Sequence, residues 1–67
     1  MNDYLMFVSK ITEMTGITNA KILEVYRQAQ LTEHEDVCQL FMDKFQLSYG
    51  FANTLADLVK TAEESDI

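Results

Sequence analysis

The side chains best suited to chemistry are one histidine and one cysteine that lie close together in the sequence. His34 and Cys38 are four residues apart, so on a helix they would share one face. A structural zinc site needs four ligands, and the sequence has no other histidine or cysteine. A Cys-His nucleophilic pair would also need an orienting group and an oxyanion hole, for which no residues stand at a matching spacing. We therefore predict no metal site, no cofactor and no enzymatic activity.

A second set of polar residues forms a candidate binding site if the starts of the third and fourth predicted helices pack together. Its members are Arg27, His34, Tyr49 and Asn53. These four residues carry the alternative hypothesis of a small-ligand-binding or enzymatic domain. Gly50 is a separate feature: glycine in the first turn of a helix lowers helix stability, which suggests that another group approaches closely there.

The charge is unevenly distributed along the 67 residues. Residues 1–31 contain three acidic and three basic side chains, whereas residues 32–67 contain eight acidic and only two basic ones. Binding to the nucleic-acid backbone requires clustered lysine and arginine, and five scattered basic residues in a chain of net charge −6 do not supply it. We predict no nucleic-acid binding. A second alternative is an acidic inhibitor or antitoxin-like protein that presents residues 32–67 to a basic partner.

Hydropathy indicates a globular protein that does not enter a membrane. Hydrophobic residues make up 48% of the chain, too many for disorder, and charged residues make up 24%. The longest apolar run, residues 4–8, is far shorter than the ~20 residues of a membrane-spanning helix. The first residues lack the basic region of a signal peptide. We therefore expect a cytoplasmic protein with no membrane partner and with Cys38 reduced.

Three short patterns predict where helices begin. An aliphatic residue precedes a hydroxyl residue at positions 17–18, 31–32 and 47–48, and the hydroxyl can accept a hydrogen bond from a backbone N–H of the first turn. Thr32 and Glu35 have the spacing of a capping box, which makes the second start the strongest. Gly16 occupies a position typical of a left-handed residue that ends a helix.

Apolar residues recur at helical spacing between these signals, and no stretch alternates as a strand would. We predict an all-α domain over residues 1–67, a compact bundle of four short helices at roughly 3–14, 19–30, 33–45 and 49–62. Glu63, Glu64 and Asp66 would place negative charge at the negative end of the last helix dipole. We therefore expect the acidic C-terminus to fray and residues 63–67 to form a flexible tail.

A few large apolar side chains fall outside the predicted core. Met6 points away from the apolar stripe of the first helix, while Leu5 and Met42 lie on the flanks of their stripes. Single exposed apolar residues are ordinary, so this observation alone is weak. A domain of this size has a small stability margin, and its single cysteine cannot form an internal disulfide. Association with a second copy or a partner would add stability. The leading hypothesis is a non-enzymatic helical protein-interaction module, with Leu5, Met6 and Met42 as a patch for a protein partner or a homodimer.

Three motifs carry a resemblance to a known family. Thr15-Gly16 matches a Thr-Gly helix stop, His34 matches the histidine of a Gly-Leu-x-x-His-x-Glu helix start, and residues 46–53 align with Gly-Leu-Gly-His-Gly-His-Ala-Asn. Through these motifs, residues 14–58 resemble a small bacterial domain family of unknown function. The resemblance implies a compact all-helical bacterial domain with no established activity.

The matching and departing positions of residues 46–53 have different implications. Gly50, Ala52 and Asn53 are retained, whereas Gln46, Ser48, Tyr49 and Phe51 replace Gly, Gly, His and His. A role that depends on the paired histidines is therefore not carried over. The retained residues fit either a binding feature or a packing device in which small side chains let two helices approach.

Overall fold

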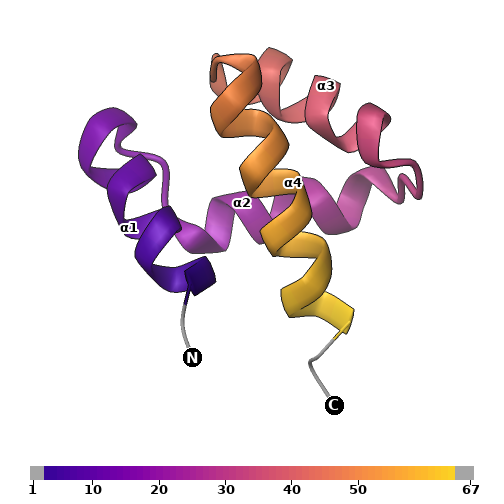
Figure 1. The fold of residues 1–67 in the computed structure, drawn as a ribbon, viewed down its shortest axis with the longest axis horizontal. Helices are drawn as coiled ribbons and strands as arrows, with labels where there is room; N and C mark the ends of the chain where they lie inside the picture. The colour runs from indigo at the N-terminus through magenta and orange to yellow at the C-terminus, as the bar shows by residue number, and fades with distance from the viewer. Residues whose placement is uncertain (1–2, 65–67) are drawn as a thin grey trace.

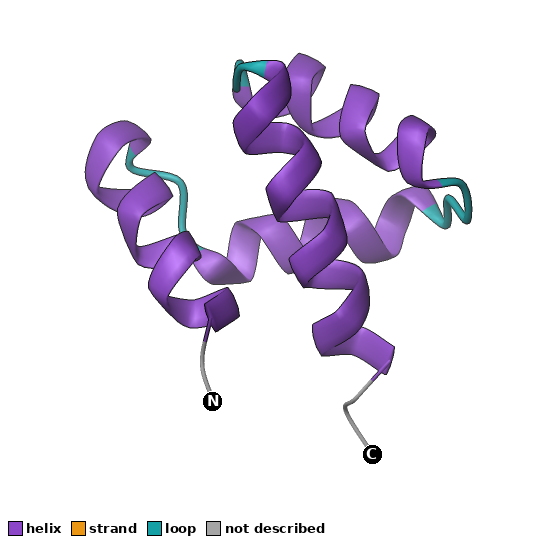
Figure 2. Cartoon of the chain, in the orientation of Figure 1, coloured by secondary structure: helices purple, strands orange, loops and turns teal. Residues whose placement is uncertain are grey.

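The computed structural model describes residues 3–64, which fold into four α-helices joined by short links (Figures 1 and 2). The helices are α1 (Asp3–Thr15), α2 (Asn19–Ala29), α3 (His34–Phe45) and α4 (Tyr49–Glu64). Residues 3–64 contain no strand. The predicted all-α bundle is confirmed, and each helix begins and ends within two residues of its predicted bounds. None of the helices in this part of the chain is both long and apolar enough to cross a bilayer.

α4 is the central element of the bundle. Figure 1 shows α1 and α3 on opposite sides of α4, with α2 running behind it. The contact between α3 and α4 is the most extensive, followed by the contacts of α1 with α4 and with α2. Ala52 and Ala56 of α4 are fully buried, and their small side chains let neighbouring helices approach closely.

All four helices contribute to one hydrophobic core. The largest completely buried side chains are Phe41, Ile11, Ile22, Leu55 and Val59. The Phe41 and Phe45 rings stack with centroids 5.5 Å apart, which fixes the inner face of α3. Met14, which continues the apolar stripe of α1, is instead 58% exposed. The apolar spacing therefore correctly predicts burial in the middle of α1 and wrongly predicts burial in its last turn.

The link between α1 and α2 confirms two sequence signals. Gly16 has a φ of +82°, in the left-handed region, and its N–H donates to the carbonyl of Thr12 at 2.7 Å. Thr18 then caps α2, because its hydroxyl accepts from the backbone N–H of Lys21 at 3.2 Å. Glycine stops the first helix and threonine starts the second, as predicted.

The capping box predicted at Thr32 is wrong. α3 is capped by Glu33, and no side-chain hydrogen bond closes its first turn. Glu35 and Asp36 still place negative charge at the positive end of the helix dipole, so electrostatics favours this start without the predicted hydrogen bond.

A second correction concerns the end of α4, which continues to Glu64, two residues beyond the predicted 62. Both carboxylate oxygens of Glu63 accept hydrogen bonds of 2.9 Å from the guanidinium of Arg27. This ion pair with α2 offsets the unfavourable charge of Glu63 at the C-terminal end of the helix dipole. The remaining residues of the predicted tail, 65–67, lie outside the described residues.

Two helices end in a conformation that suits glycine better than the residue present. Gln30 and Gln46 follow α2 and α3 with φ of 54° and 58°, in the left-handed region. This conformation costs a residue with a Cβ roughly 1 kcal/mol.

We expect Gln46→Gly to raise the free energy of unfolding by about 0.5–1 kcal/mol, because it removes the left-handed penalty at the end of α3. Gln39→Gly is the matched control, since Gln39 is an exposed residue inside the same helix. Gln39→Gly should lower the free energy of unfolding by about 1 kcal/mol. Urea denaturation followed by circular dichroism measures the free energy of unfolding of both variants. A similar loss of stability in both would contradict the prediction.

Candidate functional site

A side-chain hydrogen bond joins the starts of α3 and α4. The Nε2 atom of His34, the first residue of α3, lies 2.5 Å from Oδ1 of Asn53 in α4, and both residues are half-buried. Because an amide oxygen only accepts, the ring must carry a proton on Nε2 and donate it. The contact therefore fixes the orientation of the imidazole and leaves the Asn53 amide N–H groups available to another acceptor.

His34 and Asn53 also line a surface pocket of about 510 Å³. The remaining lining residues come from α4 and include one acid and one base: Thr54, Asp57, Leu58 and Lys60. The pocket therefore contains hydrogen-bond donors, hydrogen-bond acceptors, one negative charge and one positive charge. These groups could make polar contacts with a small molecule. The structure thus brings two of the predicted binding residues, His34 and Asn53, into one site.

Tyr49 and Gly50 begin α4, one turn before Asn53. Tyr49 shares the side of the helix on which Asn53 lies, since they are four residues apart, but its side chain is 60% exposed. At Gly50 an added Cβ would meet no atom within 4 Å. The interpretation of Gly50 as a point of close approach is therefore wrong, because open space surrounds it.

Arg27 lies away from His34 and Asn53. Its guanidinium holds Glu63, ten residues after Asn53 on the same helix, which is about 15 Å along the axis. The hypothetical cluster of four polar residues is thus divided between the two ends of α4. His34 and Asn53 lie at its start, and Arg27 lies at its end.

The end of α4 holds a polar cluster that the sequence did not reveal. The Tyr4 hydroxyl of α1 donates to Oδ1 of Asn19 in α2 at 2.5 Å, close to the Arg27–Glu63 pair. Burial raises the pKa of Tyr4, the negative charge of Glu63 raises it further, and the Arg27 charge opposes both. Polar contacts therefore tie α1, α2 and α4 together at this end. No local pattern predicts contacts between residues this far apart in sequence.

Cys38 is a buried residue of the core and is 2% exposed. Burial raises its pKa, and the neighbouring negative charge of Glu35 adds to the effect. A raised pKa lowers the thiolate fraction, which disfavours nucleophilic chemistry at neutral pH. Among residues 3–64, no group of three or more histidine, cysteine or acidic side chains is arranged to hold a metal ion.

The predicted apolar patch divides between two helices. Leu5 and Met6 of α1 are 49% and 69% exposed, whereas Met42 of α3 is half-buried and packs against the core. Leu5 and Met6 thus belong to a helix on one side of α4, and Met42 belongs to a helix on the other side (Figure 1).

A surface pocket of about 390 Å³ adjoins Met6, and it extends the apolar surface of α1 towards α4. Phe7 of α1 and Phe51 of α4 line it with their ring centroids 5.9 Å apart. Asp3 and Lys10 are its charged lining residues. The sequence singled out Met6 but missed Phe51, which reaches this surface only because α1 packs against α4.

We expect Gly50→Ala to raise the free energy of unfolding by about 0.5–1 kcal/mol, because alanine favours helix and open space surrounds the site. Gly16→Ala is the control: its φ of +82° is strained for alanine, so this change should destabilise the protein. Thermal unfolding of the two variants measures the difference. Destabilisation by Gly50→Ala would contradict the presence of open space around Gly50.

Acid should weaken the link between α2 and α4. The hydrogen bond from Arg27 lowers the pKa of Glu63 from its ordinary value of 4.5, with burial opposing and the Arg27 charge adding to the lowering. Stability from a lowered carboxyl pKa is present above the unfolded-state value and is lost as pH falls through the folded-state value.

We therefore expect Glu63→Gln to cost up to about 1 kcal/mol at pH 7, as for a partly exposed ion pair, and progressively less below about pH 4.5. Urea denaturation of wild type and variant between pH 7 and pH 3 measures this. Glu64→Gln is the control, because Glu64 is exposed and makes no ion pair with the described residues. A Glu63→Gln cost that is constant with pH would contradict the assignment.

Comparisons with protein-family models, with curated proteins and with solved structures find no match to this chain. The resemblance of residues 14–58 to a small bacterial domain family thus stays a prediction.

Proposed function

We propose that the chain is a non-enzymatic helical module that binds a protein partner or a second copy of itself through one face of α1. What we call the α1 face consists of Met6 and Phe7 of α1 and Phe51 of α4, which line one pocket, together with the exposed Leu5 that precedes Met6. The observation that carries the proposal is the exposure of Met6, 69%, beside a pocket lined by two aromatic rings. Methionine is flexible and polarisable, so it adapts well to the surface of a partner.

The composition of the α1 face supports this proposal. Its centre is apolar and aromatic, and Asp3 and Lys10 stand beside it. Protein interfaces commonly combine such a centre with a polar rim. The exposed area of the chain is 4593 Å², and a standard interface buries about 800 Å² of each partner. The contact would therefore extend beyond these four side chains over about a sixth of the surface.

A small-ligand role at the His34 and Asn53 pocket is the second candidate. The favourable observation is that the Asn53 amide, His34 and two opposite charges share one pocket of about 510 Å³. It ranks below the α1 face because Arg27 is engaged elsewhere and the His34 Nε2 proton is already donated to Asn53.

The acidic inhibitor or antitoxin-like function is a third candidate. Glu33, Glu35 and Asp36 are exposed at the start of α3, where they would be accessible to a basic protein. They also stabilise the start of a helix, so their presence does not require a partner.

We expect Met6→Glu to abolish self-association or partner capture without loss of helicity, because a charge in the centre of the face would be buried unpaired on binding. Sedimentation at micromolar concentrations and pull-down from the native host measure the two forms of association. Met14→Glu is the matched control, since Met14 is 58% exposed on α1 but does not line the pocket beside Met6.

Three outcomes would contradict or redirect the proposal. A monomer that captures no partner would overturn it, and equal effects of Met6→Glu and Met14→Glu would remove its assignment to the α1 face. If the Met6→Glu variant still captures a partner, and this binding weakens steeply as salt is added, the acidic inhibitor or antitoxin-like function would be favoured instead.

A further inference from the structure

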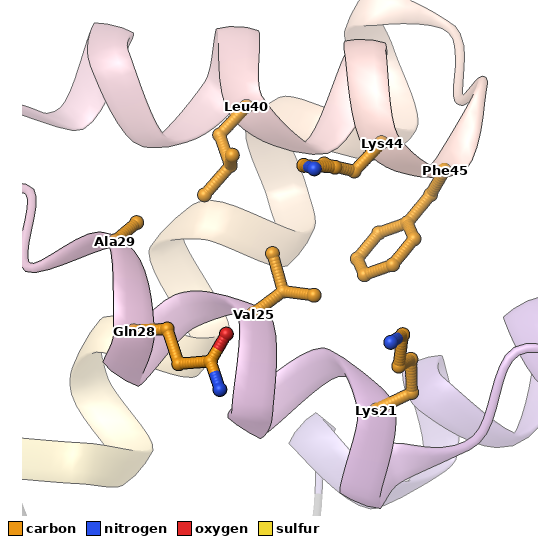
Figure 3. Close-up of a pocket in the computed structure, with 7 residues that line it drawn as sticks. All are labelled: Lys21, Val25, Gln28, Ala29, Leu40, Lys44 and Phe45. Atoms are coloured by element: carbon orange, nitrogen blue, oxygen red, sulfur yellow. The ribbon is translucent and has the colours of Figure 1, made fainter.

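A groove between α2 and α3 is separate from both surfaces described above. Its volume is about 380 Å³, and it is lined by Lys21, Val25, Gln28, Ala29, Leu40, Lys44 and Phe45 (Figure 3). None of these residues belongs to the α1 face or to the pocket of His34 and Asn53.

The interior of the groove is apolar. Figure 3 shows Leu40 and Phe45 pointing from α3 towards α2, where Val25 points back at them. These three side chains are contributed by helices that run in opposite directions and are joined by residues 30–33. A hydrophobic molecule in the groove would therefore contact both helices at once.

The charge of the groove is opposite to that of the protein. Lys21 and Lys44 are two of the five basic residues in a chain of net charge −6, and no acidic residue lines the groove. Figure 3 places the Lys44 ammonium over the gap and the Lys21 ammonium below Phe45. The groove therefore has positive charge on both of its helices, whereas the remaining surface of the chain is mainly negative and would repel an anion.

The nearest competing carboxylate belongs to Glu24, on the same helix as Lys21. Its Oε1 lies 3.6 Å from the Lys21 ammonium, and both side chains are more than half exposed. Exposed pairs at this spacing contribute little to stability. A ligand carboxylate can therefore replace Glu24 at low cost. Lys21 also lies in the first turn of α2, where the helix dipole favours negative charge.

We propose that this groove binds a small amphiphilic anion, namely an aliphatic carboxylate. The hydrocarbon chain lies along Val25, Leu40 and Phe45, and the carboxylate is held between Lys21 and Lys44. Such an arrangement, an apolar cavity with a few charged groups at its edge, is typical of small-molecule sites.

The volume of the groove is compatible with a small molecule. Small-molecule pockets are commonly about 300–1,000 Å³, and the groove falls within this range at about 380 Å³. Its charge, not its size, distinguishes it from the pocket beside Met6, because two lysines line the groove whereas Asp3 and Lys10 line that pocket.

Titration of the ¹⁵N-labelled protein with decanoate tests the proposal by ¹H–¹⁵N correlation spectra. We expect saturable shifts at Val25, Ala29, Leu40 and Phe45 at millimolar decanoate, and decanol should bind several-fold more weakly because it lacks the charge. Lys21→Gln and Lys44→Gln should each weaken decanoate binding about twofold to fivefold and leave decanol binding unchanged. Ser9→Glu is the matched control, because it makes the same change in net charge at an exposed residue of α1 that lines neither the groove nor the other two pockets.

Four outcomes would overturn the proposal. The first is the absence of shifts in the groove at about 5 mM decanoate, a concentration chosen for a dissociation constant on the order of 1 mM. The second is equal binding of decanol and decanoate, and the third is an equal effect of Ser9→Glu and Lys21→Gln on decanoate binding. The fourth is stronger groove binding by an acidic amphipathic peptide than by decanoate. Dispersed spectra of each variant show that it is folded. Met6→Glu should not alter decanoate binding, so this test is independent of the proposed function.

Discussion

The burial of α4 on several sides is the constraint on which the remaining structure depends. Leu55 and Val59 are completely buried, and Ala52 and Ala56 are small enough to let neighbouring helices lie close. Each apolar side chain in this row contributes on the order of 1–3 kcal/mol when it leaves water. Because α1 and α3 both pack on α4, the surfaces beside them exist only while this packing is intact.

Polar contacts at the two ends of α4 add orientation to this apolar packing. His34 and Asn53 join its start to α3, and Arg27 and Glu63 join its end to α2. Apolar burial is not directional, whereas hydrogen bonds require particular atoms to meet. The two ends of one helix thus hold two different neighbours in place, and this division separates Arg27 from the residues with which the sequence grouped it.

Much of the fold was predictable from the sequence because its signals are local. Apolar residues at helical spacing, Gly16 as a stop and Thr18 as a cap all act within a few residues. The site was predictable only in part. The pairing of His34 with Asn53 follows from the expected packing of two helix starts, but Arg27 and Glu63 are 36 residues apart, and no spacing rule connects them. Likewise, helical periodicity gives no reason why Met14 is exposed and Met42 half-buried, because that depends on where neighbouring helices end.

The short link between α3 and α4 also bears on how the chain folds. Only residues 46–48 separate the two helices, so little chain entropy is lost when their faces meet. The contact between α1 and α4 closes a much longer stretch of chain. Proteins dominated by local contacts fold quickly, and we expect the α3–α4 hairpin to form early, with α1 docking afterwards. The α1 face would then be completed in the last step of folding, so a partner bound there would shift the docking equilibrium of α1 as well as occupy its surface.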